Sequence, residues 1–586
     1  MAFIPGRSPR HRNILDRRQA ARPFGSREER SQVPAWKKKS SIPCGKAAAR
    51  STAPDMNMLA ADLLLSAAHR RGDATALTDP TVTLSYAELA ARTERVAHGL
   101  VALGTARLDR VAVFLEKRWE TVGALFGALR AGCVMVPINP TLKARQVRHV
   151  LQDGGVRVFI TSRSRLAGLG PILADCPALE LLVLVGEDAA ELPTIPAWIE
   201  TIAWHDLGRQ GTPALHRAID ADMAAIFYTS GSTGLPKGVA FSHRNLVAGA
   251  ESVNAYLGNG PDDRLLAALP LSFDAGFSQL TTGFAAGSRI MLLNYLLPRD
   301  LVRAIASERI TGLTGVPPLF AQLVKSEWPE GAGTSLRYLA NTGGHMPLAV
   351  LDRMRRAAPQ AQVFLMYGLT EAFRSTYLPP DELDRRPGSI GKAIPNTDIL
   401  VVDEAGIPCP PGTVGELVHR GATVALGYWN DPAGTAARFR PAPAGDAGMP
   451  AGERVVWSGD LVRRDEEGFL YFVGRRDDMI KTSGYRVSPT EIEEVAHGFP
   501  GVAEAAAVGL PDEVLGQTIA LAISPTAPDV PPDADALRDH FKSEVPLHMV
   551  PRHIVVLASL PHGPNGKIDR GTTRAILIPQ IAGIPS

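Results

Sequence analysis

The chain has 586 residues, of which 45% are hydrophobic and 21% are charged. This length is too great for one hydrophobic core, so two or more domains are expected, with the composition of an ordinary globular protein. No run approaches the roughly 18 apolar residues of a membrane span. The four cysteines show neither metal-ligand spacing nor a disulfide pattern, which favours a reducing, cytoplasmic location; they are Cys44, Cys133, Cys176 and Cys409.

The net charge of +2 conceals an asymmetry between the two ends of the chain. Residues 1–55 hold 13 Lys or Arg and 4 Asp or Glu, whereas the remainder carries a net charge of −7. The mildly acidic body argues against a nucleic-acid partner. The basic leader is interrupted by Pro and Gly and is predicted to be disordered. It lacks the apolar segment of a secretory signal, and an alternative is that translation starts at Met56 or Met58.

From residue 59 onward, predicted helices and strands alternate. Ser85 and Glu88 form a capping box that starts one of the helices. Alternating strands and helices indicate parallel sheets with helical cover. Helices are expected at 59–70 and 119–131, and strands at 82–84, 111–115, 133–137, 156–161, 180–185, 264–269, 288–293 and 311–316.

After residue 396 the pattern changes to strands joined by Pro/Gly turns, at 399–403 and 415–419, with a surface loop at 440–452. Charged residues cluster at 474–486, and a compact α/β segment follows. The predicted fold class is therefore α/β. A large N-terminal domain of parallel sheets with helical cover contains a small β-rich subdomain, and a small mobile α/β domain lies at the C-terminal end. The expected boundaries are 1–55 for the leader, 56–476, 477–570, and 571–586 for a tail.

One loop, residues 228–239, carries the clearest chemical pattern. Its sequence is Tyr-Thr-Ser-Gly-Ser-Thr-Gly-Leu-Pro-Lys-Gly-Val, and the apolar run 223–227 before it predicts a buried strand. Three glycines permit close backbone approach, while hydroxyls, N–H groups and Lys237 suit a polyphosphate. The P-loop pattern is excluded, because Pro236 and Gly238 stand where Gly and Ser/Thr would be required. The alternative, a flexible connector, would need neither the strand before it nor the Pro-Lys-Gly-Val after it.

This loop closely resembles the phosphate-binding motif of the adenylate-forming superfamily. That superfamily contains acyl-CoA synthetases, peptide-synthetase adenylation domains and beetle luciferases. The resemblance implies that the loop holds the β- and γ-phosphates of ATP, through Thr229, Ser230, Gly231, Ser232, Thr233, Gly234 and Lys237.

Two further segments match motifs of the same family, each directly after a predicted strand. By resemblance, the segment 341–347, which contains Gly343, Gly344 and His345, lines the adenine and acyl pockets. The segment 367–371, Tyr-Gly-Leu-Thr-Glu, implies that Tyr367 stacks on adenine, Thr370 contacts the α-phosphate and Glu371 holds Mg²⁺. A carboxylate is a suitable ligand for that hard cation. Considered alone, either segment is also compatible with an ordinary turn.

Three motifs near the C-terminal end complete the resemblance. Residues 457–460, Trp-Ser-Gly-Asp, have one residue fewer between the aromatic residue and Gly than the family pattern, and they assign Asp460 to the ribose hydroxyls. The segment 474–487 matches the family hinge, with Asp477 as the pivot, Arg475 on ribose and Arg486 on phosphate. Residues 564–569, Pro-Asn-Gly-Lys-Ile-Asp, place Lys567 at the substrate carboxylate and α-phosphate. The alternatives are an ordinary turn for residues 457–460, a solvated charged linker for residues 474–487, and an ordinary exposed lysine for Lys567.

The implied reaction has two steps. A carboxylate attacks the α-phosphate of Mg·ATP to give an acyl-adenylate and pyrophosphate, and a thiol then gives a thioester and AMP. Positioning and charge neutralisation supply most of the catalysis. The family hinge implies that the small domain presents Lys567 first and the 481–486 face second. The implied cofactors are ATP, Mg²⁺ and CoA, or the phosphopantetheine of a carrier protein.

The identity of the acid depends on residues 269–277, at the family's acyl-pocket position. Many fatty and aryl CoA ligases have an aromatic–His pair there, whereas this chain has Ser272-Phe273-Asp274-Ala275, as in amino-acid-activating domains. Asp274 then pairs with a substrate ammonium group, or alternatively only caps the following helix. Some stand-alone acyl ligases of bacterial polysaccharide and exosortase gene clusters also carry Ser-Phe-Asp here, and the chain resembles them.

The expected substrate is therefore a small carboxylic or amino acid. No carrier domain follows Arg570, so we expect the acceptor to be CoA or a separate acyl carrier protein. The favoured function is an AMP-forming acyl-CoA ligase, and the alternative is amino-acid adenylation that loads a carrier protein. A luciferase-like enzyme without a thiol acceptor and an inactive nucleotide-binding module are further alternatives. Lys237, Glu371, Asp460 and Lys567 argue against the inactive module.

Overall fold

A computed structural model describes residues 58–186, 190–229, 236–443, 452–476, 478–482, 485–512, 515–527, 529–563 and 566–582. Four sequence predictions fall outside these ranges: the disordered leader, the start at Met56, phosphate-loop residues 230–235, and the hinge at Asp477. Residues Asp55–Ser586 form one compact unit. In the part of the chain that is described, no helix combines the length and apolarity that a membrane crossing needs.

The first sheet has eight strands in the order β19-β9-β8-β4-β3-β5-β6-β7. Its strands from β8 to β7 are parallel, whereas β9 and β19 are antiparallel. The strands are β3 (Arg110–Phe114), β4 (Val134–Pro137), β5 (Val158–Ser162), β6 (Leu181–Val185), β7 (Glu200–Ala203), β8 (Met223–Thr229), β9 (Lys237–Ser242) and β19 (Gly427–Tyr428).

Both faces of this sheet are buried, which explains its continuous apolar strand sequences. In β3, Val111 and Val113 pack into one core cluster, while Ala112 and Phe114 pack into another on the opposite face. The second cluster includes residues of the covering helices α4 (Ala144–Asp153), α5 (Arg163–Ala167) and η1 (Pro171–Asp175).

The second sheet has fourteen strands, and its central run β14-β13-β12-β10-β11-β1 is parallel. The strands of this part are β1 (Thr75–Thr78), β2 (Thr83–Ser85), β10 (Arg264–Ala267), β11 (Arg289–Leu292), β12 (Gly312–Gly315), β13 (Tyr338–Asn341), β14 (Gln362–Tyr367) and β15 (Thr376–Leu378). One face is covered by α9 (Pro298–Ser307), α10 (Pro317–Leu323) and α11 (Leu348–Ala357).

The β-rich region predicted after residue 396 is confirmed, and its strands continue the second sheet beyond β15. The link is antiparallel pairing of β16 with both β15 and β22. A short strand, β20, occupies the start of the loop predicted at 440–452, of which 444–451 lie outside the described ranges. The strands are β16 (Ser389–Ala393), β17 (Thr397–Val402), β18 (Val414–Gly421), β20 (Phe439–Pro441), β21 (Arg454–Arg464) and β22 (Leu470–Arg475).

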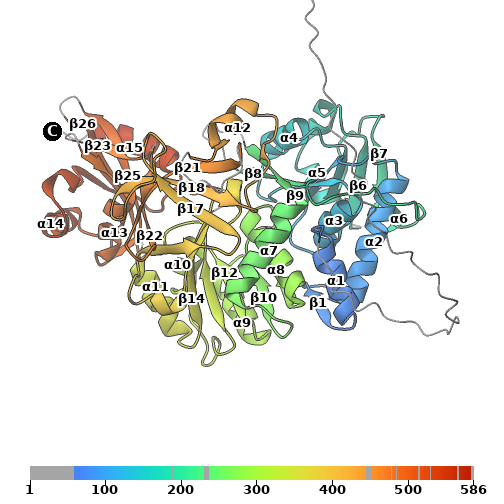
Figure 1. Cartoon of the computed structure of the whole chain (residues 1–586), viewed down its shortest axis with the longest axis horizontal. Coiled ribbons are helices and arrows are strands. Elements are labelled where there is room, and N and C mark those ends of the chain that lie inside the picture. Colours follow the sequence, from blue (N-terminus) through green and yellow to red (C-terminus); the bar gives the residue numbers. More distant parts are fainter. Residues whose placement is uncertain are drawn as a thin grey trace, which may run out of the picture. The chain divides into compact units, whose positions relative to one another are not determined.

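A layer of helices lies between the two large sheets. Its core contains Val111 of the first sheet and Ile290 of the second, and Phe126 of α3 stacks on Phe277 of α8 with ring centroids 5.6 Å apart. Figure 1 shows α7 and α8 in green beside β10. The layer consists of α1 (Asp62–Arg71), α2 (Tyr86–Ala102), α3 (Trp119–Arg130), α7 (His243–Leu257) and α8 (Asp274–Ala286). The predicted capping box at Ser85 and Glu88 starts α2.

The C-terminal segment has its own five-stranded sheet, ordered β24-β23-β26-β25 with β27 on β26. Helices α13 and α14 pack on one face, and Leu577 of α15 is buried in a separate cluster with Ala506 and Ala520 of the sheet. Helix α15 continues this segment to Ala582, beyond the predicted end at 570. The elements are β23 (Ile480–Thr482), β24 (Tyr485–Val487), α13 (Pro489–Gly498), β25 (Val502–Asp512), β26 (Gly516–Pro525), α14 (Ala534–Glu544), β27 (His553–Val556) and α15 (Arg570–Ala582).

Candidate active site

The predicted site residues follow neighbouring parallel strands of the second sheet. Phe273 and Asp274 come after β10, Gly343 and Gly344 come after β13, and Tyr367 ends β14. The carboxyl ends of parallel strands meet at one edge of a sheet, which is where ligands bind in open α/β sheets. The topology therefore places three separate sequence motifs at one edge.

Asp460 is the centre of the predicted ribose group. Its partners are Tyr367, whose hydroxyl donates to Asp460 Oδ2 at 2.5 Å, and Arg475, whose Nε lies 3.1 Å from Asp460 Oδ1. The antiparallel register of β21 and β22 pairs Asp460 directly with Arg475. Burial raises the pKa of Asp460, and the charge of Arg475 acts against this rise. The ion pair is not aligned as a hydrogen bond, so Oδ1 remains a buried acceptor.

Glu371, the predicted Mg²⁺ ligand, lies in the short 3-10 turn η2 (Thr370–Ala372) together with Thr370. The Tyr428 hydroxyl donates to Glu371 Oε1, and Arg438 Nε lies 3.8 Å from that oxygen. The ring of Tyr428 is in turn 5.5 Å from the Nζ of Lys237. Through Tyr428, the lysine of the phosphate loop and the predicted metal carboxylate are thus close neighbours.

Lys237 is placed by a β-hairpin, since β8 and β9 are antiparallel and Thr229 pairs with Lys237. Its Nζ lies 3.3 Å from Asp431 Oδ2. The loop therefore returns into a strand, unlike a P-loop, which leads into a helix. Its residues Ser230, Gly231, Ser232, Thr233 and Gly234 lie outside the described ranges.

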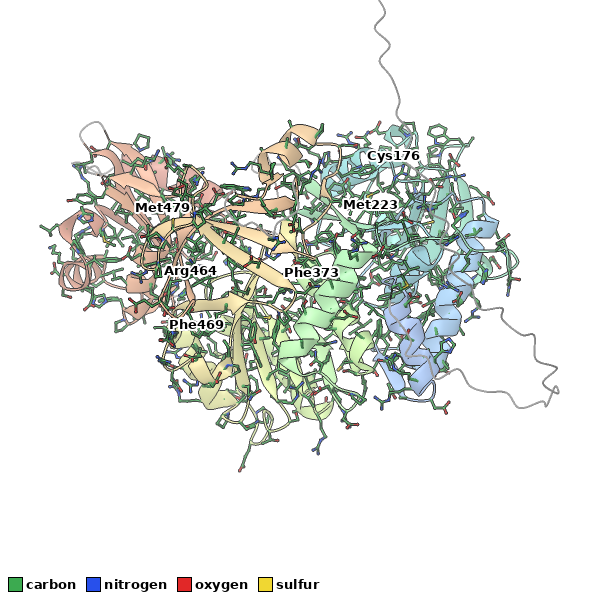
Figure 2. The ribbon with its side chains drawn as sticks, viewed as in Figure 1. Cys176, Met223, Phe373, Arg464, Phe469 and Met479 are labelled. Atoms are coloured by element: carbon green, nitrogen blue, oxygen red, sulfur yellow. The ribbon has the colours of Figure 1, made fainter. Side chains whose placement is uncertain are left out.

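A strained turn follows Glu371. Phe373 has φ 59° and ψ −62°, and Arg374 N–H donates to Ala372 O at 2.7 Å, which closes a γ-turn of the rare positive-φ form. The Phe373 side chain, labelled in Figure 2, is fully buried and packs edge-on against Phe241. Such strain persists only where the surrounding structure fixes it, and it is concentrated at functional sites. Here it positions Arg374.

Arg374 forms an ion pair with Asp274. Arg374 Nη1 lies 3.3 Å from Asp274 Oδ2 and donates to Phe373 O at 2.7 Å. Burial raises the pKa of Asp274, and the positive charge of Arg374 opposes the rise. Phe273, half-buried, is the N-cap residue of α8, and Asp274 is the first residue inside the helix. The N-cap position therefore belongs to Phe273, Asp274 lies in the first turn of the helix, and the chain itself supplies a cation to Asp274.

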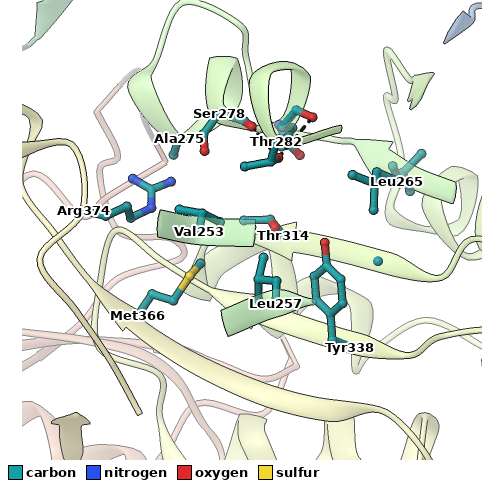
Figure 3. A pocket seen from close by; sticks show the side chains of 13 residues that line it. Val253, Leu257, Leu265, Ala275, Ser278, Thr282, Thr314, Tyr338, Met366 and Arg374 are labelled. Carbon is teal, nitrogen blue, oxygen red and sulfur yellow. Dashed lines mark hydrogen bonds between the residues drawn. The ribbon is translucent and has the colours of Figure 1, made fainter. Parts of the chain in front are cut away.

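A cavity of about 20 Å³ adjoins this ion pair. Figure 3 shows Arg374 and Met366 at one end and Leu265 and Tyr338 at the other, with Ser278 and Thr282 of α8 along one side. The lining combines apolar side chains with hydroxyl and amide groups. Such a mixture is typical of a pocket that binds and orients a small ligand.

Lys567 lies among the site's carboxylates. Its Cε is 3.7 Å from the position that a Cβ on Gly343 would occupy, and Gly343 has φ 78°, which favours glycine. Burial lowers the pKa of Lys567, whereas Asp274, Asp460 and Glu371 act in the opposite direction. The structure thus brings the lysine of the last motif to the residues of three earlier ones.

The structure leaves open the roles of three predicted site residues, His345, Arg486 and Asp477. His345 Nε2 lies 2.7 Å from Glu494 Oε2 on α13, so its side chain contacts the C-terminal segment, and its substrate role stays a prediction. Arg486 is in β24, with its side chain outside the description, and Asp477 lies outside it altogether. The roles of both also stay predictions.

Unsatisfied polar atoms gather around this site. Ten buried side-chain nitrogen or oxygen atoms in the described residues have no hydrogen-bond partner, and six of the ten belong to residues of this region. Buried polar groups are normally paired, so such atoms call for an explanation. Two of them, on Gln279 and Arg374, belong to residues that line the cavity. The six belong to Ser272, Gln279, Asn341, Arg374, Arg438 and Asp460.

Several of the side chains that complete the site were not predicted from the sequence. Arg374 is three residues after Glu371 and follows the apolar pair Ala372-Phe373. The need of a buried Asp274 for a cation was visible in the sequence, but it was assigned to a substrate ammonium group. Tyr428, Arg438 and Gln279 carry no motif, and only the tertiary structure brings them to the site.

The metal prediction rests on one carboxylate. Among the described residues, no group of three or more His, Cys, Asp or Glu side chains is arranged to hold a metal ion. The residues present fit Mg²⁺ in its usual role beside a nucleotide, where one or two carboxylates and the phosphates themselves are the ligands.

Comparison with known proteins identifies the class. Residues 64–429 match the family described as AMP-binding enzyme, and residues 491–567 match the AMP-binding enzyme C-terminal domain. The chain belongs to this family and is an adenylate-forming ligase. The resemblance inferred from the motifs and the predicted fold class are both confirmed.

Individual relatives span different chemistries. The chain is 34% identical to the L-proline–[L-prolyl-carrier protein] ligase of Streptomyces coelicolor, over 86% of this chain and 93% of that protein. It is 30% identical to a long-chain-fatty-acid–CoA ligase of Escherichia coli O6:H1, over 89% and 95%. It is also 32% identical to a linear gramicidin synthase of Brevibacillus parabrevis, but there the match covers only 6% of the much longer relative.

A solved structure supports the fold. The anthranilate CoA ligase AuaEII, crystallised with anthranoyl-AMP, superposes with a TM-score of 0.79 at 26% identity, over 89% of this chain and 98% of that one. The similar proteins thus include enzymes named for CoA and an enzyme named for a carrier protein.

Proposed function

We propose that this protein is an AMP-forming acyl-CoA ligase. It activates a small carboxylic acid with ATP, releases pyrophosphate, and transfers the acyl group to the thiol of CoA. The observation that carries the choice of acid is the Asp274–Arg374 ion pair. Because Arg374 already neutralises Asp274, the pocket has no need of a substrate ammonium group.

The site residues divide between the nucleotide and the reacting groups. Tyr367 stacks on adenine, and the unsatisfied Oδ1 of Asp460 accepts the ribose hydroxyls beside Arg475. Lys237 and the loop before it hold the outer phosphates. Glu371 holds Mg²⁺, which when bound neutralises phosphate charge.

The first step needs positive charge where the carboxylate attacks phosphorus. Lys567 supplies it, close to Gly343 and within the field of Asp274 and Glu371. Charge that is already in place stabilises the transition state without reorganisation. Thr370 contacts the α-phosphate, and the oxygen of the acid forms the new P–O bond as pyrophosphate leaves.

The second step needs a different neighbour for the adenylate. The thiol attacks the acyl carbon, its proton is lost, and AMP leaves. We propose a boundary between 476 and 477, with rotation about Asp477 that withdraws Lys567 and brings the face containing Arg486 to the site. The hydrogen bond between His345 and Glu494 belongs to the arrangement in which Lys567 is at the site.

The second candidate is amino-acid adenylation that loads the phosphopantetheine of a separate carrier protein. Asp274 itself and the likeness to the prolyl-carrier ligase favour it. In that case the substrate ammonium must compete with Arg374 for Asp274.

Pyrophosphate exchange with matched acids separates the two candidates. The proposal expects exchange with small carboxylic acids and weak exchange with their amino-substituted counterparts. Addition of CoA should then yield an acyl-CoA, detected by mass spectrometry. Preferential exchange with amino acids, and label transferred to a phosphopantetheinylated carrier protein but never to CoA, would overturn the proposal.

A further inference from the structure

The pocket next to the ion pair contains two buried polar atoms without a hydrogen-bond partner. They are Arg374 Nε, a donor, and Gln279 Oε1, an acceptor. Both residues line the cavity, and they are 3% and 6% exposed. An unpaired buried donor or acceptor destabilises the folded chain, so a site that keeps one of each is suited to a ligand that pairs both.

The neighbouring contacts fix which atoms are available. Gln279 Nε2 donates to Gly276 O at 3.1 Å, so the amide nitrogen is used and the carbonyl oxygen remains. Arg374 Nη1 contacts Asp274 and donates to Phe373 O, whereas the buried Nε–H has no partner. The unpaired buried atoms of the described lining residues are therefore one N–H and one carbonyl oxygen.

This combination discriminates among the groups that an acid can carry. An ammonium group has only donors and would repel the guanidinium of Arg374, whereas a second carboxylate has only acceptors and would repel Gln279 Oε1. An alkyl group would leave both atoms unpaired. A hydroxyl has both a lone pair and a proton, so it satisfies both atoms at once.

The charge and the size of the pocket further narrow the class of acid that it can bind. The Asp274–Arg374 pair carries no net charge, so it does not attract a second anion. The cavity of about 20 Å³ is little more than the space of a water molecule, and Leu265 and Tyr338 lie at the end away from Arg374 (Figure 3). This volume suits one small group of the acid, about the size of a hydroxyl.

We propose that the acid activated by this enzyme is a short hydroxy acid. Its hydroxyl accepts from Arg374 Nε–H and donates to Gln279 Oε1. The inference rests on the proposed function, because it takes this cavity to be the acyl pocket. Gln279 and Arg374 are then the residues that determine specificity.

The test compares four-carbon acids that differ in one substituent. Pyrophosphate exchange is measured with butyrate, with 2-, 3- and 4-hydroxybutyrate, with 4-aminobutyrate and with succinate. We expect one hydroxybutyrate to exceed each of the other classes in kcat/KM by at least about tenfold, because a site built to hydrogen-bond a substrate hydroxyl rejects analogues that lack it. Butyrate, aminobutyrate or succinate matching the best hydroxybutyrate would overturn the inference, as would no exchange with any hydroxybutyrate.

Variants of Gln279 test whether the preference for a hydroxy acid depends on this pocket. Gln279→Leu, checked for folding by its melting temperature, should reduce the ratio of hydroxybutyrate to butyrate exchange toward one, and Gln279→Met serves if Leu is not tolerated. Gln322→Leu, on the exposed side of α10, is the matched control and should keep the ratio. An unchanged ratio in a folded Gln279 variant would contradict the assignment.

Failure of the proposed function would give a different experimental result from failure of this inference. If a hydroxy acid supports exchange but CoA yields no thioester, the thiol acceptor is wrong and the hydroxyl preference stands.

Discussion

The proposed nucleotide region and the proposed acyl pocket are built in different ways. The proposed nucleotide residues Tyr367, Asp460 and Lys567 each belong to a contiguous motif, and Tyr367 and Asp460 are placed by strands of the same sheet. The acyl pocket depends on Asp274 and Arg374, which are 100 residues apart and meet only through a strained turn at Phe373. On the proposed assignment, the chemistry common to the family is carried by local motifs, while the choice of acid depends on tertiary pairing.

The strongest destabilisation should come from disrupting the acyl pocket. Asp274→Leu and Arg374→Met should each lower the free energy of unfolding by about 3–5 kcal/mol, because each leaves a buried charge unpaired, and the double variant should lose much less. Urea denaturation measures all three.

The exposed pair Asp206–Arg209 provides the matched control for this experiment. Asp206→Ala should cost at most about 1 kcal/mol. If either buried single variant costs no more than this control, Asp274 and Arg374 are not a coupled pair.

The second-largest effect is expected on the rate of pyrophosphate exchange when Lys567 is replaced. Lys567→Ala should slow pyrophosphate exchange by about 10²–10³-fold, since it removes charge aimed at the transition state. Thioester formation from a supplied acyl-adenylate should persist. Lys542→Ala, an exposed lysine of α14, should leave both half-reactions intact. Equal loss of both half-reactions in Lys567→Ala would contradict the alternation of the small domain.

The third prediction tests ribose binding. Asp460→Asn should raise the KM for ATP by about tenfold to a hundredfold, because a charge-assisted hydrogen bond contributes about 1.5–3 kcal/mol. The KM for the acid should change little, because Asp460 is assigned to the nucleotide. A larger change in the KM for the acid than in the KM for ATP would contradict the assignment of Asp460 to the nucleotide region.

The fourth prediction is a pH dependence. Burial lowers the pKa of Lys567, and its ammonium form exists only below that pKa. Adenylation should therefore decline as the pH rises through this lowered value, before an ordinary lysine loses its proton. In Lys567→Arg the guanidinium stays charged, so the residual exchange should lack this alkaline decline. The same decline in both proteins would assign it to another group.

A weaker effect is expected at the contact between His345 and Glu494. Both side chains are about one-third exposed, so His345→Ala should change the ratio of adenylation to thioester formation by only about twofold to fivefold. His205→Ala, an exposed histidine, is the control. A loss of acid specificity in His345→Ala, rather than a changed ratio, would support the substrate role predicted from the sequence.

Sequence periodicity predicted many of the parallel strands of the two large sheets, because their residues are apolar on both faces, but it did not predict β1 or β7. The strand expected at 111–115 is β3 at Arg110–Phe114, and that expected at 133–137 is β4 at Val134–Pro137. The continuation of the second sheet through β16 was not predictable, since strand pairing across about 80 residues leaves no local pattern. The same holds for Arg374: its charge was visible, but its partner depended on the tertiary structure.

A crystal structure with a non-hydrolysable acyl-sulfamoyl adenosine would decide which kind of acid the pocket accepts. We expect adenosine at Tyr367 and Asp460, and the acyl group beside an intact Asp274–Arg374 pair. An aminoacyl analogue of equal length should bind more weakly. An ammonium group bound to Asp274, with Arg374 displaced from it, would contradict the neutral-pocket assignment and identify the enzyme as an amino-acid-activating ligase.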